Sequence, residues 1–260
     1  MSIIIEQLPL PLPVPGLRHA LSTRGGGVSE GAFASLNLGY HVGDDPARVC
    51  ENRRRLARAA GYDAGALVCA QQVHGVALAW VGADARGRGA VSWDDALPAI
   101  DGLLTRESRL PLAILVADCA PVLIADPRRR VLAVVHAGWR GALGGIASAA
   151  VRRMIADAGT DPAQLVVGIG PALCPACLEV GEEVATAVRD AGKSAALCDG
   201  EARPHLELAA LIGLDLATVG VTAAQIGRHQ DCTRCRPERY FSHRGQQGNA
   251  GRLACVAWWE

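Results

Sequence analysis

Two long apolar runs, separated by a short polar turn, constrain the fold of this chain more than any other feature of its sequence. The runs fall within 111–126 and 130–136, and the sequence Asp-Pro-Arg-Arg at 126–129 joins them. Runs that are rich in Val, Leu and Ile and bounded by turn formers are typical of buried strands. The region therefore predicts a buried β-hairpin.

Helices are expected on both sides of this hairpin. The clearest one covers 46–60, where Asp44 or Asp45 can cap the first turn and Pro46 suits the first helical position. Gly61 suits the position after the last helical residue. The other expected helices lie near 142–158, 180–191 and 206–218.

Strand patterns are more numerous than helix patterns and are unevenly distributed. The expected strands cover 19–23, 67–81, 101–105, 111–119, 122–126, 130–136, 165–170 and 253–259. Strands come in runs, and helices lie between some runs and not others. This arrangement favours an α+β fold with a mixed sheet over a doubly wound α/β fold.

Composition limits the class of protein. The chain has 260 residues, of which 50% are hydrophobic and 20% charged, which suits one large domain or two small ones. No repeat, low-complexity segment or linker divides it, so we expect a single domain over 1–260. Lys plus Arg equals Asp plus Glu at 26 each, which argues against nucleic-acid binding over a broad basic surface.

The sequence predicts a cytoplasmic protein that does not enter a membrane. No stretch of roughly 18 residues is free of charges and turn formers. The apolar segment 1–16 lacks a basic start and contains several prolines, so it does not match a signal peptide. The nine cysteines are an odd number and, with a large core, indicate a reducing compartment rather than a disulfide scaffold.

The hairpin brings together two residues that can carry chemistry. If its turn closes symmetrically, Cys119 on the first strand faces His136 on the second. Directly opposed Cβ atoms lie roughly 4.5–5.5 Å apart, so the two side chains would share a metal or form a thiolate–imidazole pair. A slip of one residue would place them on opposite faces of the sheet.

His74, followed by glycine, is a third candidate ligand. Two histidines and one cysteine form a borderline-soft set that suits Zn²⁺, and three protein ligands leave a fourth position for water or substrate. The alternative is a histidine that only packs within a strand. Beside the cysteine, Asp118 would act as a base or orient a ligand if the strand ends there, and otherwise serves as a turn residue.

Anion-binding positions are expected at two glycine-rich segments. After His136 the chain runs Ala-Gly-Trp-Arg-Gly into an expected helix, so Arg140 and free backbone N–H groups would attract phosphate or carboxylate. The alternative is a tight connection between strand and helix. Arg24, followed by three glycines, is the second candidate.

Four cysteines form two Cys-x-x-Cys pairs, Cys174 with Cys177 and Cys232 with Cys235. The 54 residues between the pairs far exceed the usual spacing of a structural zinc site. We therefore favour separate buried or surface thiols over a four-cysteine metal site.

At this point the sequence resembles a known family. QQVHG with His74, VADCAPV with Cys119 and VHAGWRG with His136 match three signature segments of the YfiH family, also called the laccase-domain, polyphenol-oxidase or multicopper-oxidase-like family. Further matching segments cover nearly the whole chain, at 22–53, 101–105, 168–184, 205–208 and 240–254. The sequence departs from the family at Cys174-Pro-Ala-Cys177 and at His243-Arg244-Gly245.

The resemblance implies a fold, a cofactor and an activity. The fold would be a layered α-β-β-α sandwich, and the three matching residues would bind one zinc ion. The activity would be cleavage of adenosine, inosine, guanosine or methylthioadenosine by phosphate, with adenosine deamination as a companion. Zinc would activate the attacking oxygen, Asp118 would handle protons, and Arg24, Asn37, Arg140 and Arg244 would contact substrate.

Other activities stay open at this stage. The chain has seven histidines and no His-x-His, which is too few for the copper centres of a multicopper oxidase. One His₂Cys site would still accept Cu²⁺, which binds more tightly than Zn²⁺, and would allow weak polyphenol oxidation. A Cys119–His136 pair would instead suit a cysteine hydrolase or an amidase that edits peptidoglycan precursors. A third alternative is a protein that binds nucleosides without turnover.

Overall fold

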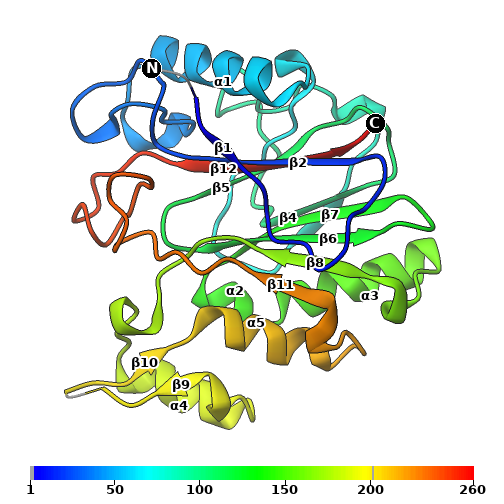
Figure 1. Ribbon diagram of the computed structural model, residues 1–260, viewed down its shortest axis with the longest axis vertical. Coiled ribbons are helices and arrows are strands. Elements are labelled where there is room, and N and C mark those ends of the chain that lie inside the picture. The colour runs from blue at the N-terminus through cyan, green and yellow to red at the C-terminus, as the bar shows by residue number, and fades with distance from the viewer. Residues whose placement is uncertain (1–2, 201) are drawn as a thin grey trace.

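The computed structural model describes residues 3–200 and 202–260 and confirms the α+β class. Figure 1 shows two stacked sheets, with one long helix over the outer face of the first sheet and several helices under the second. The layers therefore follow the order α-β-β-α.

The two sheets are built from strands far apart in the sequence. The first sheet has the order β1 (Ile5–Glu6), β2 (Leu17–Ser22), β12 (Leu253–Trp259) and β5 (Leu112–Val116). The second has the order β11 (Ile226–Arg228), β8 (Val166–Ile169), β6 (Ala120–Asp126), β7 (Val131–Ala137), β4 (Gly102–Thr105) and β3 (Leu78–Trp80). β9 (Leu197–Cys198) and β10 (His205–Leu206) form a small separate ribbon. The second sheet is mixed, because its outer strands β3 and β11 run parallel to their neighbours while its inner strands are antiparallel.

The helices flank these sheets. They are α1 (Pro46–Ala60), α2 (Trp139–Leu143), α3 (Ile146–Ala158), α4 (Glu182–Asp190) and α5 (Leu208–Ala217). The capping prediction for α1 is confirmed, since Asp45 accepts a hydrogen bond from the Ala47 amide and Gly61 adopts a left-handed φ of 86°. In the ranges that the structure describes, no helix is both long and apolar enough to span a bilayer.

Two expected elements, the helix over 142–158 and the strand over 67–81, differ most from the prediction. The helix expected over 142–158 is divided into α2 and α3 by Gly144 and Gly145, and Gly145 has a left-handed φ of 82° that interrupts the helix. The strand expected over 67–81 is regular only in β3, because the chain makes a turn at 71–75 before it. That turn carries His74.

The predicted hairpin forms, but its register is wrong by two residues. Pro121, and not Cys119, pairs with His136, and Asp126 pairs with Val131. Cys119 lies just before β6, in the connection that carries the chain from the first sheet to the second.

The turn of the hairpin explains the shift. The Asp126 carboxylate accepts hydrogen bonds from the amides of Arg128 and Arg129, both at 3.0 Å. Arg130 then adopts a left-handed φ of 52°. Four residues therefore form the turn where the symmetric register assumed two.

β6 and β7 are buried on both faces, which explains their continuous apolar runs. Leu123 and Val134 pack between the two sheets, together with Trp259 of the first sheet. Ile124 and Val135 face the opposite way, against the helical layer of α3 and α5. These central strands give the site at their ends a rigid support.

Candidate metal centre and active-site cavity

His74, Cys119 and His136 lie together at one end of the central strands. Their ligand atoms are all within 4.8 Å of one another. His74 comes from the turn before β3, Cys119 from the connection into β6, and His136 from the end of β7. The structure thus brings together the three residues that the sequence singled out, although through different backbone geometry.

A buried carboxylate that sequence reasoning missed organises this cluster. Asp101 accepts hydrogen bonds from the amides of Val73, His74 and Gly75 at 3.2, 2.9 and 2.8 Å. Three consecutive N–H groups thus enclose one carboxylate, and His74 has a left-handed φ of 64° in this turn. The carboxylate also lies 2.8 Å from His136 Nδ1.

Asp101 therefore fixes both histidines. An ionised carboxylate only accepts hydrogen bonds, so His136 Nδ1 carries the proton and its Nε2 is the nitrogen available to a metal. The sequence contained one indication of this role, because Asp101 begins the segment DGLLT that matches the family.

The electrostatics of the cluster favour a thiolate. Burial raises the pKa of Cys119, but hydrogen bonds with His136 and His74 outweigh it and lower the pKa to about 6. Burial lowers the pKa of His136, but hydrogen bonds with Asp101 and Cys119 raise it to about 9. Burial also raises the pKa of Asp101, yet His136 and the Gly75 amide hold it below its usual value.

The residues present fit a metal ion. A thiolate sulfur and two imidazole nitrogens are the donors that Zn²⁺ prefers, and such ligands bind in their deprotonated forms. Gly138 leaves room for the cluster, because a Cβ there would lie 3.0 Å from Cys119 Sγ and 3.2 Å from His74 Cδ2. The backbone therefore approaches the ligands as closely as a glycine allows.

The cluster opens into a cavity of about 350 Å³. The apolar residues that line the cavity are Leu115, Trp139, Leu173, Leu178 and Leu208. The lining also includes nitrogen-bearing side chains, namely His41, Gln72, Arg140, His243, Arg244 and Arg252. A larger cavity of about 770 Å³ near Tyr62 and Arg109 is lined by no histidine or cysteine, so we place the site in the smaller one.

Asp118 lines the cavity, but both of its carboxylate oxygens are engaged. Oδ1 accepts from the Thr233 hydroxyl at 2.6 Å, and Oδ2 accepts from the Arg244 amide at 2.7 Å. Its left-handed φ of 88° turns the chain so that Cys119 faces the histidines. Through these contacts and its backbone turn, Asp118 positions Arg244 and Cys119.

The four expected substrate contacts differ in their positions. Arg140 and Arg244 line the cavity. Arg24 does not, because its guanidinium donates to the carbonyls of residues 34 and 237 and stacks on an aromatic ring. Asn37 is fully buried, and its Oδ1 accepts from the Arg252 amide at 2.8 Å. Asn37 thus supports a lining residue and lies behind the cavity wall.

Arg252 and His41 are cavity residues that the sequence did not single out. Burial lowers the pKa of Arg252 from its usual value, while the nearby Cys119 and Asp118 raise it. Burial, followed by the charge of Arg252, lowers the pKa of His41 to about 4, so this imidazole is neutral. Arg252 belongs to the segment 240–254, whose match to the family was the available indication.

The glycine-rich segment after His136 leads into the short helix α2, which has five residues. At the start of the next helix, α3, Asp215 accepts from the Ser148 amide and hydroxyl at 2.9 and 2.8 Å. The Ser148 amide is thus satisfied within the protein, while the anion site expected at Arg140 stays a prediction.

The structure also brings together the four cysteines of the two Cys-x-x-Cys pairs. The Sγ atoms of Cys174, Cys177, Cys232 and Cys235 lie within 4.8 Å of one another. The chain between the two pairs folds back, so their long separation in sequence does not keep them apart.

The chain is similar to known proteins over nearly its whole length. A family model described as multi-copper polyphenol oxidoreductase laccase matches residues 18–260. Purine nucleoside phosphorylase YlmD of Geobacillus stearothermophilus is 38% identical over 245 residues, 93% of this chain and 89% of that protein. Adenosine deaminase RL5, from an unknown prokaryotic organism, is 33% identical over 254 residues, 96% of this chain and 97% of that protein.

Two solved structures are similar along the chain. The crystal structure of YlmD from Geobacillus stearothermophilus has a TM-score of 0.93 and 34% identity and covers both chains completely. That of the Bacillus licheniformis hypothetical protein YfiH has a TM-score of 0.91 and 34% identity, and the match covers 94% of this chain and 93% of the other.

Proposed function

Because the chain belongs to the laccase-like family that includes the YfiH and YlmD proteins, we propose that it is a metal-dependent purine nucleoside phosphorylase. The observation that carries the proposal is one cavity that combines a His₂Cys cluster, apolar lining residues and three arginines. Its volume of about 350 Å³ lies within the range of roughly 300–1,000 Å³ typical of small-molecule sites. Adenosine deamination is the proposed companion activity, since one relative carries that name.

His74, Cys119 and His136 would hold the metal, which we assign as Zn²⁺ from the donor set. When bound, zinc would supply a Lewis acid that stabilises negative charge on a reacting oxygen. Cu²⁺ would compete for the same ligands in vitro. Asp101 accepts from His136 Nδ1, which orients the ring so that the neutral imidazole would present Nε2 to the metal.

The cavity lining offers groups for both halves of the reaction. A purine base is flat and largely apolar at its faces, and it suits apolar lining residues such as Leu173, Leu178 and Trp139. Phosphate is an anion, and it suits Arg140, Arg244 and Arg252. The partners are therefore a small nucleoside and inorganic phosphate.

In phosphorolysis, an oxygen of phosphate forms a bond to C1′ of the ribose while the bond from C1′ to the base nitrogen breaks. The bonding electrons leave with the base, and the proton that phosphate gives up balances the proton that the base gains. Arg252 is half-buried and lines the cavity near Cys119 and Asp118, so its charge is placed to attract phosphate. The arginines thus bring the nucleophile to the sugar.

The test is product analysis on metal-quantified protein. We would incubate the enzyme with adenosine, inosine or methylthioadenosine, with and without phosphate, and separate the bases by chromatography. We expect base release that depends on phosphate and is lost in His74→Ala. His19→Ala changes a histidine of β2 outside the cavity and is the matched control. Zinc-loaded protein that turns over no nucleoside would overturn the proposal.

A second candidate, a cysteine hydrolase, is favoured by one observation. The low pKa of Cys119 and the high pKa of His136 suit a thiolate–imidazolium pair, which attacks amides without a metal. Such an enzyme would tolerate His74→Ala, would lose activity on alkylation of Cys119 and would act on peptidoglycan precursors. Activity of metal-free protein on an amide substrate would favour this candidate.

A further inference from the structure

The four clustered cysteines lie on two turns of similar shape. Cys174 and Cys177 lie at the two ends of a turn in which the Cys177 amide donates to the Cys174 carbonyl at 2.9 Å. Cys232 and Cys235 lie on a second turn, in which the Arg236 amide donates to the Cys232 carbonyl at 3.1 Å. Paired Cys-x-x-Cys turns of this kind are the usual way in which proteins present four sulfurs to one metal.

Backbone contacts already hold the two turns against each other. Ala172 and Cys232 form a parallel β-bridge, and the Thr233 amide donates to the Ala172 carbonyl at 3.1 Å. The Cys174 amide donates to Cys232 Sγ at 3.3 Å. The fold itself therefore brings the four sulfurs together. A metal would bind to a cluster that is already largely assembled, with little further loss of conformational entropy.

The distances suit a closed tetrahedral site. Sulfurs bound about 2.3 Å from one zinc ion lie about 3.8 Å apart. The Sγ atoms here are within 4.8 Å of one another, and those of Cys177 and Cys235 are 3.5 Å apart. A shift of about 1 Å or less would thus bring the four sulfurs to the distances of a tetrahedral zinc site.

We propose that Cys174, Cys177, Cys232 and Cys235 bind one Zn²⁺ ion in a second, structural site. All four positions of this metal would be filled by protein sulfur, so it would have no open position for substrate. The proposal does not depend on the phosphorylase reaction, because it concerns metal content and stability.

The position of the site gives it a role. The two turns continue into the wall of the active-site cavity through Leu173, Leu178 and Arg244. The Leu173 amide donates to the Asp118 carbonyl at 3.1 Å, and Arg244 Nη1 donates to the Cys177 carbonyl at 2.9 Å. Zinc at the four cysteines would lock this wall in place beside the catalytic cluster.

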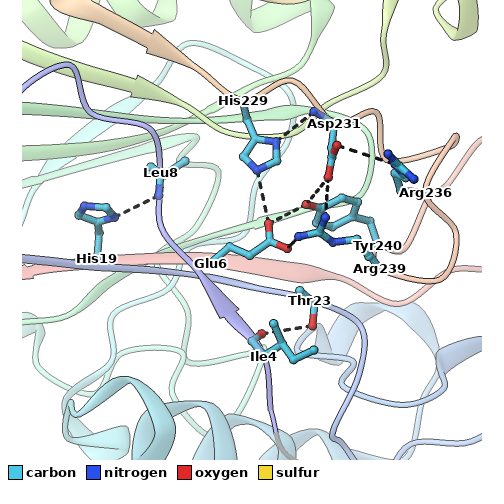
Figure 2. A network of polar contacts seen from close by, with 10 residues as sticks. All are labelled: Ile4, Glu6, Leu8, His19, Thr23, His229, Asp231, Arg236, Arg239 and Tyr240. Carbon is cyan, nitrogen blue, oxygen red and sulfur yellow. Dashed lines mark hydrogen bonds and ion pairs between the residues drawn. The ribbon is translucent and has the colours of Figure 1, made fainter.

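The segment 229–240, which carries Cys232 and Cys235, is also held by contacts with β1 that need no metal. Figure 2 shows that Glu6 of β1 contacts His229, Arg239 and Tyr240, which lie before and after Cys232 and Cys235 in sequence. The segment is thus anchored at both ends, and loss of the zinc would free mainly the part between them. We expect that loss to weaken substrate binding more than it slows turnover.

Metal counting on protein purified under reducing conditions tests the proposal. We expect two zinc ions per chain in the wild type, one in Cys235→Ser, one in His74→Ala and none in the double variant. Cys235 is exposed and serine is of similar size, so we expect the replacement to preserve the fold, which circular dichroism checks. Cys198→Ser, which changes a half-buried cysteine outside both clusters, is the control and should keep two zinc ions.

Spectroscopy identifies the ligands without relying on activity. In His74→Ala loaded with Co²⁺, we expect the intense charge-transfer and d–d bands of a tetrahedral four-thiolate site. These bands should disappear in the double variant with Cys235→Ser. Three results would each overturn the assignment. They are equal zinc content in Cys235→Ser and wild type, disulfide bonds among the four cysteines detected by mass spectrometry, and iron in place of zinc.

Discussion

At the residue scale, the site depends on what Asp101 does for two histidines. Its carboxylate accepts from three consecutive amides around His74 and from His136 Nδ1, so one buried charge sets a backbone turn and a ring orientation. The sequence predicted the three clustered side chains from their chemistry and from family segments. It did not predict Asp101, because a carboxylate before a strand has no pattern that distinguishes this role from a turn residue.

Replacing Asp101 by asparagine tests this role. The amide is neutral and cannot accept from all four donors as strongly, so both histidines lose orientation. We expect metal affinity to fall about 10–100-fold, as is typical when the partner of a ligating histidine is lost. Competition with a chromophoric chelator measures the affinity. Asp84→Asn, at an exposed aspartate, should leave it unchanged, and equal affinities in the two variants would contradict the role of Asp101.

The pKa of Cys119 predicts the pH dependence of its reactivity in metal-free protein. The thiolate is the reactive form, and the pKa is lowered to about 6, so alkylation by iodoacetamide should rise with pH through about 6 and then level off. Mass spectrometry of the peptide that contains Cys119 follows the reaction. A midpoint near the ordinary thiol value of 9.0 would show that His136 and His74 do not stabilise the thiolate.

At the scale of elements, strand identity was easier to predict than strand pairing. The strand expected over 253–259 is confirmed with the same bounds, because its apolar residues and the glycine before it are local features. The register of β6 and β7 was wrong, because the Asp126 side chain selects a four-residue turn. The convergence of the four cysteines also depends on tertiary packing and has no local pattern.

The junction of β7 and α2 gives a prediction at this scale. Gly138→Ala adds a methyl group where a Cβ would lie 3.0 Å from Cys119 Sγ. Forcing a methyl group into a packed site costs about 1–3 kcal/mol, so we expect metal affinity to fall about 5- to 150-fold. Isothermal titration of Zn²⁺ into chelator-treated protein measures it. Gly25→Ala is the matched control, since a Cβ there meets no atom within 4 Å, and unchanged affinity in Gly138→Ala would contradict the close approach.

At the scale of the whole molecule, the first strand and the C-terminal third of the chain are joined by a polar network. Figure 2 shows Glu6 among His229, Arg239 and Tyr240, and the Tyr240 hydroxyl donates to Glu6 at 2.6 Å. The layer order α-β-β-α places the central strands between two cores, and the site lies where the chain passes between the sheets. The resemblance implied these layers, while the sequence pattern alone gave only the α+β class.

The Glu6 network predicts acid sensitivity of the fold. Burial raises the pKa of Glu6, but hydrogen bonds with His229, Tyr240 and Arg239 outweigh it and lower the pKa from 4.5 to about 2. The ionised carboxylate therefore stabilises the fold fully above about pH 4.5, by at most about 3 kcal/mol, and this contribution disappears as the pH falls toward about 2.

Urea unfolding of Glu6→Gln checks this prediction. The difference in unfolding free energy from wild type should be large at neutral pH and should shrink as the pH falls through that window. Glu238→Gln, at an exposed glutamate of the same segment, should differ little from wild type at any pH. A difference for Glu6→Gln that does not change with pH would show that the ionisation of Glu6 is not its source.

The central claim is that this cavity transfers a pentose from a purine to phosphate. Phosphorus-31 NMR of zinc-loaded enzyme with inosine and inorganic phosphate tests it most directly, because inosine has no amino group whose removal would complicate the products. We predict a growing ribose 1-phosphate signal in step with hypoxanthine release, and no such signal with His74→Ala. The claim would be contradicted if hypoxanthine appeared together with free ribose while the phosphate signal stayed unchanged. It would also be contradicted if inosine stayed intact.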